Sequence, residues 1–477
     1  MATKMVIDPV TRIEGHLKIE VTADLVNGQQ QVVEARATGT LFRGFETILR
    51  GRDPFDAPDI TARICGVCPT PHNQAAVAAL DAVMGIHVPD NARLLRNLVL
   101  AADFLHSHIL HFYQLAALDY MVAPGMAPWQ PAWSADIRFD DATSQTLLAH
   151  YVTALDMRRK AHEMGAVFGG RLPHTPAFIG GGFTGAPTAE QIQQFRSYAA
   201  EILPFIRDVY LPDVEAVAQT YRDYFQIGAG PKNLLAFGVF DENPQGTVQL
   251  FRRGRTEAGS TAPKAVDVRA IAEDVTASWY SDRSGLNPAS GTTTPAYPKP
   301  GGYSWLKSPR YGGKAYEVGP LARMTVNGDY SGGVSVMDRH AARAQEALKI
   351  ASAIDGWLDQ LVPAGPVFVD NGMPSRGSGI GLTEAPRGAL GHWLSVADNR
   401  ISRYQIVTPT CWNASPRDAR ALPGALEQAL VGTPVSDTEQ PIEVLRVIHS
   451  FDPCLSCAVH VARPGRDAAV SIATAGD

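Results

Sequence analysis

Two segments near the beginning of the chain alternate apolar and polar residues, as half-buried β-strands do. They cover residues 16–23 and 30–37, and the dipeptide Asn27-Gly28 stands between them. Asn-Gly favours the positive φ angles of a tight hairpin turn. The pattern therefore predicts a β-hairpin.

Further along, apolar residues recur every three to four positions, which is the spacing of a helix. One such run covers residues 90–121 and is apolar on more than one face. A helix of this kind is buried in the middle of a bundle. Further helical patterns cover 143–167, 189–225 with breaks near Pro204 and Pro212, 339–361 and 416–431, and strand-like alternation returns at 389–408.

Residues 229–333 are rich in Gly, Pro, Ser and Thr and contain few periodic runs. We expect them to form a loop-rich insertion packed on the bundle. The whole pattern predicts an α+β fold that is mainly α, with a central helical bundle and small peripheral β-sheets. The length of 477 residues alone would allow about three domains, but no linker divides the chain.

Composition and charge narrow the classes of function. Charged residues make up 19% of the chain, below the usual ~25%, which suggests that a partner covers part of the surface. The formal net charge of -6 leaves no basic footprint for binding nucleic acid. No apolar run reaches the roughly 18 to 20 residues that a membrane span needs.

The cysteines are the strongest chemical signal. Cys65/Cys68 and Cys454/Cys457 form two C-x-x-C pairs near opposite ends of the chain, and Cys411 stands alone. Thiolate sulfur is a soft ligand that selects zinc, copper(I), iron-sulfur clusters or nickel. A four-cysteine structural zinc site is one alternative, but its ligand pairs usually lie close together in a small domain. A dithiol redox pair is a second alternative. A shared metal site would join both ends into a single domain over residues 1–460.

Six motifs, in chain order, resemble those of nickel-iron hydrogenase large subunits. The likeness spans nearly the whole chain, and the two cysteine motifs with their flanks are its most specific part. The motifs are RIEGHL at 12–17, RGFE at 43–46, RICGVCPTPH at 63–72, EAPRG at 384–388, TPTCWNASPRD at 408–418 and DPCLSCAVH at 452–460.

The resemblance implies that Cys65, Cys68, Cys454 and Cys457 ligate nickel. Cys68 and Cys457 would also bridge to an iron that carries carbon monoxide and cyanide. The implied activity is the reversible heterolytic cleavage of H2 to protons and electrons, with uptake as the expected direction. Cys411 is expected to be a buried small residue, because four thiolates already satisfy nickel.

The resemblance also assigns residues around the metal pair. Arg387 would donate hydrogen bonds to one cyanide or act as a base, which suits its multi-donor fork, and Thr410 would donate to the other cyanide. His72 would hydrogen-bond a bridging cysteine sulfur. Asp119 and Asp452 would frame the pocket near Arg387. Each residue also has a simpler interpretation: a salt bridge for Arg387, a strand position for Thr410 and helix N-capping for Asp452.

Proton transfer and a second metal complete the implied site. Glu14 would be the first proton relay, next to Cys454, although it could simply begin a strand or pair with Arg12. Glu46, His460 and the backbone carbonyl of Ile406 would bind magnesium or a similar divalent ion.

Residues 461–477 follow the last matching histidine. In the family, a dedicated protease removes such an extension after nickel-insertion proteins have loaded the metal, an instance of metal binding coupled to folding. Hydrogen-sensing members generally end near that histidine, so the extension favours a catalytic uptake enzyme. The chain is short for the membrane-bound uptake class, which keeps a slow hydrogen sensor as an alternative.

A partner subunit is implied as well. The chain has no cysteines left for an iron-sulfur relay, so electrons must leave through an iron-sulfur small subunit in a heterodimer with a large interface. The first nine residues do not resemble a signal peptide. We therefore expect a cytoplasmic or peripherally membrane-associated location, with export possible only through the partner's signal peptide.

Overall fold

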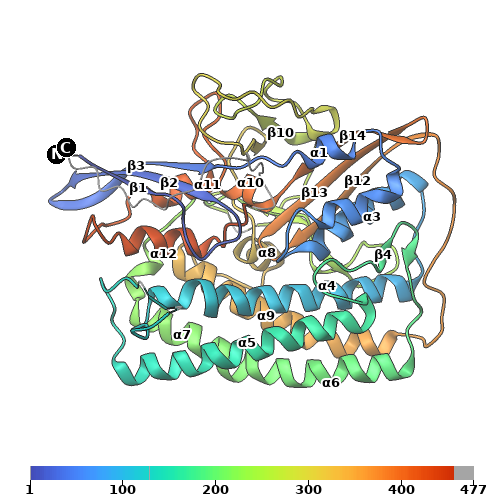
Figure 1. Cartoon of the computed structure of the whole chain (residues 1–477), viewed down its shortest axis with the longest axis horizontal. Helices are drawn as coiled ribbons and strands as arrows, with labels where there is room; N and C mark the ends of the chain where they lie inside the picture. Colours follow the sequence, from blue (N-terminus) through green and yellow to red (C-terminus); the bar gives the residue numbers. More distant parts are fainter. Residues whose placement is uncertain (1, 128, 131, 261, 456–477) are drawn as a thin grey trace.

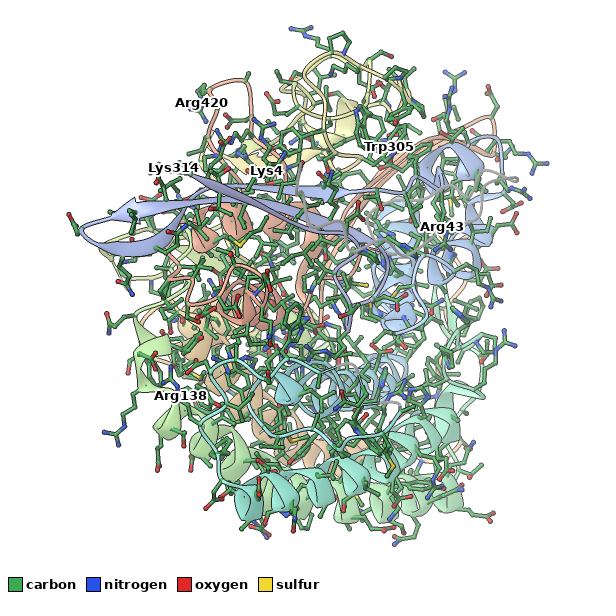
Figure 2. All side chains as sticks on the ribbon, turned by 60° about the vertical axis from the view of Figure 1, so that its left-hand side comes forward. Lys4, Arg43, Arg138, Trp305, Lys314 and Arg420 are labelled. Atoms are coloured by element: carbon green, nitrogen blue, oxygen red, sulfur yellow. The ribbon has the colours of Figure 1, made fainter. Side chains whose placement is uncertain are left out.

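The four long helices form a bundle, and the sheets, the loops and the shorter helices, α3 among them, lie above it (Figure 1). The computed structural model describes residues 2–127, 129–130, 132–260 and 262–455. Helix α4 contacts α5 and α9, and α6 contacts the same two helices. Side chains fill the space between the bundle and the elements above it (Figure 2). The four helices span Asp90–Leu110, Asp141–Gly169, Ala189–Phe205 and Val336–Gln360.

Helix α4 is buried on nearly every face, as its apolar pattern predicts. The chain leaves α geometry at His111 and continues as a π-helical segment, His111–Ala116, and a 3-10 turn, Ala117–Asp119. π-helical turns occur frequently at functional sites. This one directs the ring of His111 to the carbonyl oxygen of His449, which is 2.7 Å away.

Near Pro204 and Pro212, where breaks were predicted, the helix changes its hydrogen-bond pattern and does not end. Pro204 lies in the last turn of α6, and a π-helical segment, Ile206–Tyr210, follows directly. A proline removes one backbone donor and crowds the preceding turn, so the hydrogen-bond register shifts. Helix α7, Leu211–Thr220, then begins with Pro212 in its first turn, where a missing N–H costs nothing. The chain stays helical through both prolines.

The predicted hairpin is confirmed. Strands β2 (Leu17–Val26) and β3 (Gln29–Gly39) pair antiparallel. Asn27 and Gly28 form the turn with φ of 53° and 82°. A third strand that the sequence pattern did not indicate, β1 (Thr3–Ile7), pairs with β2.

A second three-stranded sheet lies against helix α3. Its strands are β12 (Arg376–Ala385), β13 (Gly388–Ala397) and β14 (Arg400–Val407), so the alternation at 389–408 covers two strands and β12 went unpredicted. A Cβ on Gly379 or Gly381 would lie about 2 Å from backbone oxygens of α3 (Pro69–Met84). The alternating glycines therefore let the helix approach the sheet closely.

The helix predicted at 416–431 is wrong for most of its length. Only α11, Ala425–Leu430, is helical there. Residues 416–424 form a loop in which the Asp418 carboxylate accepts from the backbone N–H groups of Arg420 and Leu422 and pairs with Arg310. Proline at positions 416 and 423 interrupts the helical hydrogen bonds that the apolar spacing suggested.

The remaining elements are short. Besides α3, the helices not predicted are α1 (Phe45–Leu49), α2 (Ala57–Ala62), α8 (Pro320–Asn327), α10 (Pro409–Asn413) and α12 (Ile442–Ser450). The short strands are β4 (Phe178–Ile179), β5 (Gly182–Phe183), β6 (Leu234–Ala236), β7 (Val239–Asp241), β8 (Gln249–Phe251), β9 (Gly254–Thr256), β10 (Ile271–Asp274) and β11 (Ser308–Tyr311).

The predicted fold class, α+β and mainly α with small sheets around a helical bundle, is confirmed. The N-terminal sheet packs on the last part of the described chain, since the amide of Ala37 donates to Glu427 in α11. A single domain over 1–460 stays a prediction, because residues 456–460 lie outside the described part. In the described part, no helix combines the length and the apolar character needed to cross a membrane.

Candidate metal centre

Three cysteines from opposite ends of the chain meet in one pocket. Cys65 and Cys68 lie in the loop before α3, and Cys454 follows α12. The sulfurs of Cys65 and Cys454 are 3.4 Å apart, and all three sulfurs lie within 4.8 Å of one another. Each residue is 1% exposed. The fourth predicted ligand, Cys457, lies outside the described residues.

The local backbone favours negative charge on sulfur. The amides of Val67 and Cys68 each point at the sulfur of Cys65 over 3.3 Å. Cys68 is also the N-cap of α3, where the helix dipole stabilises anions. Ile64, Phe45 and Ile406 pack around the sulfurs. Convergent sulfurs in an apolar pocket fit a thiophilic metal such as nickel.

Glu14 lies beside Cys454 because their backbones pair. The amide of Glu14 donates to the carbonyl of Pro453 over 3.3 Å, and the amide of Leu455 donates to the carbonyl of Glu14 over 2.6 Å. The N-terminal segment thus runs alongside the cysteine loop. The position agrees with the relay that the resemblance implies, and the role itself stays a prediction.

Arg387 lies in the turn between β12 and β13 and is 2% exposed, so it is no surface arginine. Its Nη2 lies 3.0 Å from Oδ1 of Asp452, and its Nη1 lies 3.4 Å from the hydroxyl of Ser107. Burial alone would lower the pKa of Arg387, but Asp452 and the cysteine sulfurs hold it well above its usual value. The guanidinium is therefore a fixed cation whose donors sit near the sulfurs.

In the described part of the chain, the side-chain contacts of Asp119 are with residues other than Arg387. Its carboxylate binds the guanidinium of Arg12 and, over 2.5 Å, Nδ1 of His449. Burial raises the pKa of Asp119, but Arg12 and His449 bring it well below its usual value. Ser107 of α4 contacts Arg387 instead, and the sequence analysis missed it. A serine inside an apolar helix carries no signal of such a role.

Thr410 connects a short helix to the third cysteine. It lies in α10, not in a strand, and its hydroxyl oxygen accepts the backbone N–H of Cys454 over 3.0 Å. Because the oxygen is the acceptor there, its own proton remains available as a donor. Cys411, the next residue, is 6% exposed. Burial raises the pKa of its thiol to about 11, as expected for an inert, buried cysteine.

His72 lies in the first turn of α3, one turn after Cys68. Its Nδ1 is 3.2 Å from Nε2 of His392 in β13. Burial lowers the pKa of His72 to about 4, with opposing effects from Cys65 and Arg43. The imidazole is therefore neutral at physiological pH.

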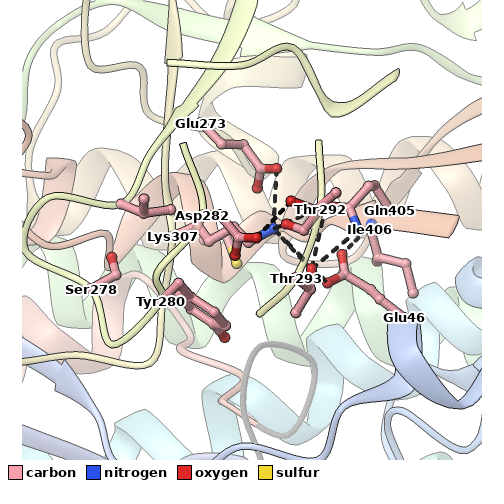
Figure 3. Close-up of polar contacts among 12 residues, drawn as sticks. Glu46, Glu273, Ser278, Tyr280, Asp282, Thr292, Thr293, Lys307, Gln405 and Ile406 are labelled. Atoms are coloured by element: carbon pink, nitrogen blue, oxygen red, sulfur yellow. Dashed lines mark hydrogen bonds and ion pairs between the residues drawn. The ribbon is translucent and has the colours of Figure 1, made fainter. Parts of the chain in front are cut away.

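Glu46 and Ile406 lie together in a cleft beside the sulfurs. Oε1 of Glu46 accepts the backbone N–H of Ile406 over 2.8 Å, and Thr293 donates to Oε2 (Figure 3). In a strand, the N–H and C=O of one residue point to the same edge, so the carbonyl of Ile406 faces Glu46 as well. Arg43 and Trp305 line the same cleft and lie on the same side of the molecule (Figure 2). The predicted third ligand, His460, lies outside the described residues.

The cleft also contains a buried ammonium that the sequence analysis missed. Nζ of Lys307 lies 3.6 Å from Glu273, 4.0 Å from Glu46 and 2.9 Å from the amide oxygen of Gln405 (Figure 3). Burial raises the pKa of Glu273 to about 7, although Lys307 opposes this. Carboxylate, amide, hydroxyl and carbonyl oxygens are the ligands that a hard divalent cation prefers. The described residues thus fit such an ion, and Lys307 already balances part of the negative charge of Glu46 and Glu273.

Comparisons with known proteins agree with this geometry. The family described as nickel-dependent hydrogenase matches residues 43–138, 122–333 and 329–460, and a family described as HoxL-like matches residues 4–37. The periplasmic NiFeSe hydrogenase large subunit of Desulfomicrobium baculatum is 42% identical, over 98% of this chain and 97% of that protein. The uptake hydrogenase large subunit of Bradyrhizobium diazoefficiens is 34% identical, over 97% of this chain and 96% of that protein.

Solved structures show the same similarity in three dimensions. The reduced NiFeSe hydrogenase of Desulfovibrio vulgaris Hildenborough superposes with a TM-score of 0.93 and 43% identity, covering 96% of this chain and all of that one. Similarity at this level extends over the bundle, the sheets and the cysteine pocket together. The chain therefore belongs to the nickel-dependent hydrogenase family and is the large subunit of an oxidoreductase that acts on H2.

Proposed function

We propose that this chain cleaves H2 heterolytically and reversibly at a nickel-iron centre held by Cys65, Cys68, Cys454 and Cys457, and that it works in the uptake direction. The observation that supports this most is the convergence of three buried sulfurs beside the Arg387–Asp452 pair. Two solved relatives are named for selenium, whereas this sequence has cysteine at all four positions. The proposed ligand set is therefore entirely sulfur.

When bound, a nickel-iron centre with carbon monoxide and cyanide on iron supplies the electrophile and the electron acceptor. The chain supplies the surroundings. Arg387, held by Asp452 and Ser107, would donate hydrogen bonds to one anionic cyanide. Thr410 would donate its hydroxyl proton to the other. Because these side chains are all buried, water is excluded and each hydrogen bond is stronger than in solvent.

The proton released from H2 needs a path outward. We assign its first step to Glu14, whose backbone pairs with that of Cys454. The carboxylate would take the proton from the Cys454 sulfur and pass it toward the surface. Glu46, Ile406 and His460 would hold the magnesium-type ion that stabilises the neighbouring loop.

Electrons would leave through an iron-sulfur small subunit, since relatives are named large subunits or large chains. Ile48 and Phe55 are 44% and 48% exposed and lie in the segment just before Cys65. Exposed apolar residues of this kind suit an interface. The relative from D. baculatum is named periplasmic. We extend the same compartment to this complex, with export directed by the partner.

Maturation is part of the proposal. Nickel-insertion proteins would load the metal, and a protease would then remove residues 461–477. The intact mass of the nickel-loaded chain is expected to correspond to residues 1–460. A nickel-loaded sample that keeps the extension would overturn this step.

The decisive experiment uses the complex purified with its small subunit. Metal analysis is expected to find nickel and iron, and the infrared spectrum should contain carbonyl and cyanide bands. H2 uptake with a dye acceptor is expected at roughly 10 turnovers per second or more. Zinc without these bands would leave a structural metal site, and bands with very slow turnover would leave a hydrogen sensor.

A further inference from the structure

A line of three buried polar side chains leads away from the cysteine pocket. Nδ1 of His72 is 3.2 Å from Nε2 of His392, and Nδ1 of His392 is 2.8 Å from the hydroxyl of Tyr404. The residues come from α3, β13 and β14 and are at most 1% exposed. The ring centroids lie 5.4 and 5.5 Å apart along the line. His392 and Tyr404 have no role in the mechanism so far.

Both histidines are fully buried, and burial favours the neutral imidazole over the charged imidazolium, so each ring is neutral. A neutral imidazole has one N–H donor and one acceptor nitrogen. Burial also raises the pKa of Tyr404, so its hydroxyl keeps its proton. The Tyr404 hydroxyl and the two imidazoles therefore carry one proton each, and these protons must satisfy the His72–His392 and His392–Tyr404 hydrogen bonds.

Only two arrangements satisfy both contacts. In the first, Tyr404 donates to Nδ1 of His392, and Nε2–H of His392 donates to Nδ1 of His72. In the second, His72 donates from Nδ1 to His392, and His392 donates from Nδ1 to the oxygen of Tyr404. The first arrangement leaves Nε2 of His72 as a donor, and the second leaves it as an acceptor.

The hydroxyl of Tyr404 decides between them. Across the described part of the chain, its one hydrogen-bond partner is His392. In the second arrangement the hydroxyl proton would be buried without an acceptor, which costs free energy. The first arrangement uses that proton. It therefore predominates, and His72 carries its proton on Nε2.

The position of His72 in α3 indicates where its Nε2–H group points. His72 follows Cys68 by four residues on entry to α3, and side chains at this spacing share a helix face. With Nδ1 occupied by His392, the free nitrogen is Nε2. A donor to a cysteine sulfur withdraws electron density from the metal that the sulfur binds, as such contacts do at other metal–thiolate sites.

We propose that Tyr404 and His392 are positioning residues that hold His72 as the Nε2–H tautomer, so that it donates to the cysteine sulfurs of the metal centre. This inference rests on the proposed function. Tyr404 would act across two hydrogen bonds without touching the metal or the substrate.

The test is Tyr404→Phe in the complex with its small subunit. Phenylalanine keeps the ring but removes the hydroxyl proton, so His392 no longer favours one tautomer of His72. With a weaker donor, the sulfur returns electron density to iron, and the carbonyl stretching band is expected to shift to lower wavenumber. The midpoint potential of the centre is expected to fall as well.

Tyr113→Phe is the matched control, since Tyr113 is also fully buried and donates one hydrogen bond, to Asp213. Tyr113→Phe should leave the carbonyl band unmoved and should lower the thermal stability by about as much as Tyr404→Phe does. A double-mutant cycle gives the sharper result. In a His72→Leu background, Tyr404→Phe is expected to cause no further shift.

The outcomes separate the two claims. A wild-type complex without carbonyl and cyanide bands would overturn the proposed function. If the wild-type complex has the bands and the Tyr404→Phe variant matches it in band position and potential, only the positioning role of Tyr404 and His392 is overturned. Equal shifts from Tyr404→Phe with and without His72 would also overturn it, because the effect would then bypass His72.

Discussion

The sulfur pocket and the Glu46–Lys307 cleft lie side by side but are built on opposite principles. In the pocket, three cysteines, each 1% exposed, lie within 4.8 Å of one another and are enclosed by apolar side chains. In the cleft, carboxylate, amide and hydroxyl oxygens surround a buried ammonium. One region suits a soft metal held permanently, and the other a hard ion held by charge balance.

The difference concerns how each region is encoded. The sulfur ligands come in two local C-x-x-C motifs, each of which is recognisable by itself. The cleft combines Glu46, Glu273, Thr293, Lys307 and Gln405, and none of these residue types at these spacings is unusual. Four predictions separate the two regions, beginning with the largest expected effect.

Replacing one sulfur should abolish the function of the pocket. Cys65→Ser is expected to lose nickel and all measurable H2 uptake, because a hydroxyl is a poor ligand for a thiophilic metal. Metal analysis and the dye assay measure both effects. Cys411→Ser is the matched control and should retain nickel. Loss of nickel in the control would place Cys411 in the metal site.

Changing the cation beside the pocket should affect turnover but not metal content. Arg387→Lys keeps the charge but loses the fork that reaches Asp452 and Ser107, so the rate is expected to fall by roughly 10²–10³-fold. Arg376→Lys changes a largely exposed arginine at the start of β12 and should behave like the wild type. An unchanged rate for Arg387→Lys would argue against its assigned role.

Removing the ammonium of the cleft should affect stability more than catalysis. Lys307→Met leaves Glu46 and Glu273 without their cation, and loss of one partner from a buried pair costs about 3–5 kcal/mol. Chemical unfolding of the wild type and the variant measures the difference. Lys314→Met removes an exposed ammonium 3.7 Å from Glu257 and is expected to cost less than about 1 kcal/mol. Similar losses in both variants would contradict the proposed charge balance.

Chelation should produce the smallest effect and distinguish the regions without mutation. EDTA is expected to remove the magnesium-type ion from the open cleft, to lower the melting temperature by a few degrees and to leave nickel bound. Added Mg²⁺ should restore the loss. Removal of nickel together with the hard ion would show that the pocket is as accessible as the cleft.

The sequence predicted the regular parts of the fold well. Periodicity located the hairpin, the buried helix from Asp90 and the long helices, because each depends on local spacing. It missed α3 and β12, whose association depends on glycines that face another element. It wrongly extended a helix over 416–424, where Asp418 organises a loop.

For the candidate site, too, the sequence predicted some features and missed others. Motifs identified the cysteines, and the structure then brought Glu14, Arg387, Thr410 and Asp452 to the same region. Asp119 instead contacts Arg12 and His449, a distinction that motif position could not make. Ser107 takes the place beside Arg387.

By itself, therefore, the sequence determined the soft ligands, the family and the main helices, because short-range spacing encodes them. The tertiary structure alone decided the neighbours of Arg387, the ammonium among the carboxylates, and the line from His72 to Tyr404. These contacts join residues far apart in the chain. Their geometry follows from packing, which no local pattern of residue types records.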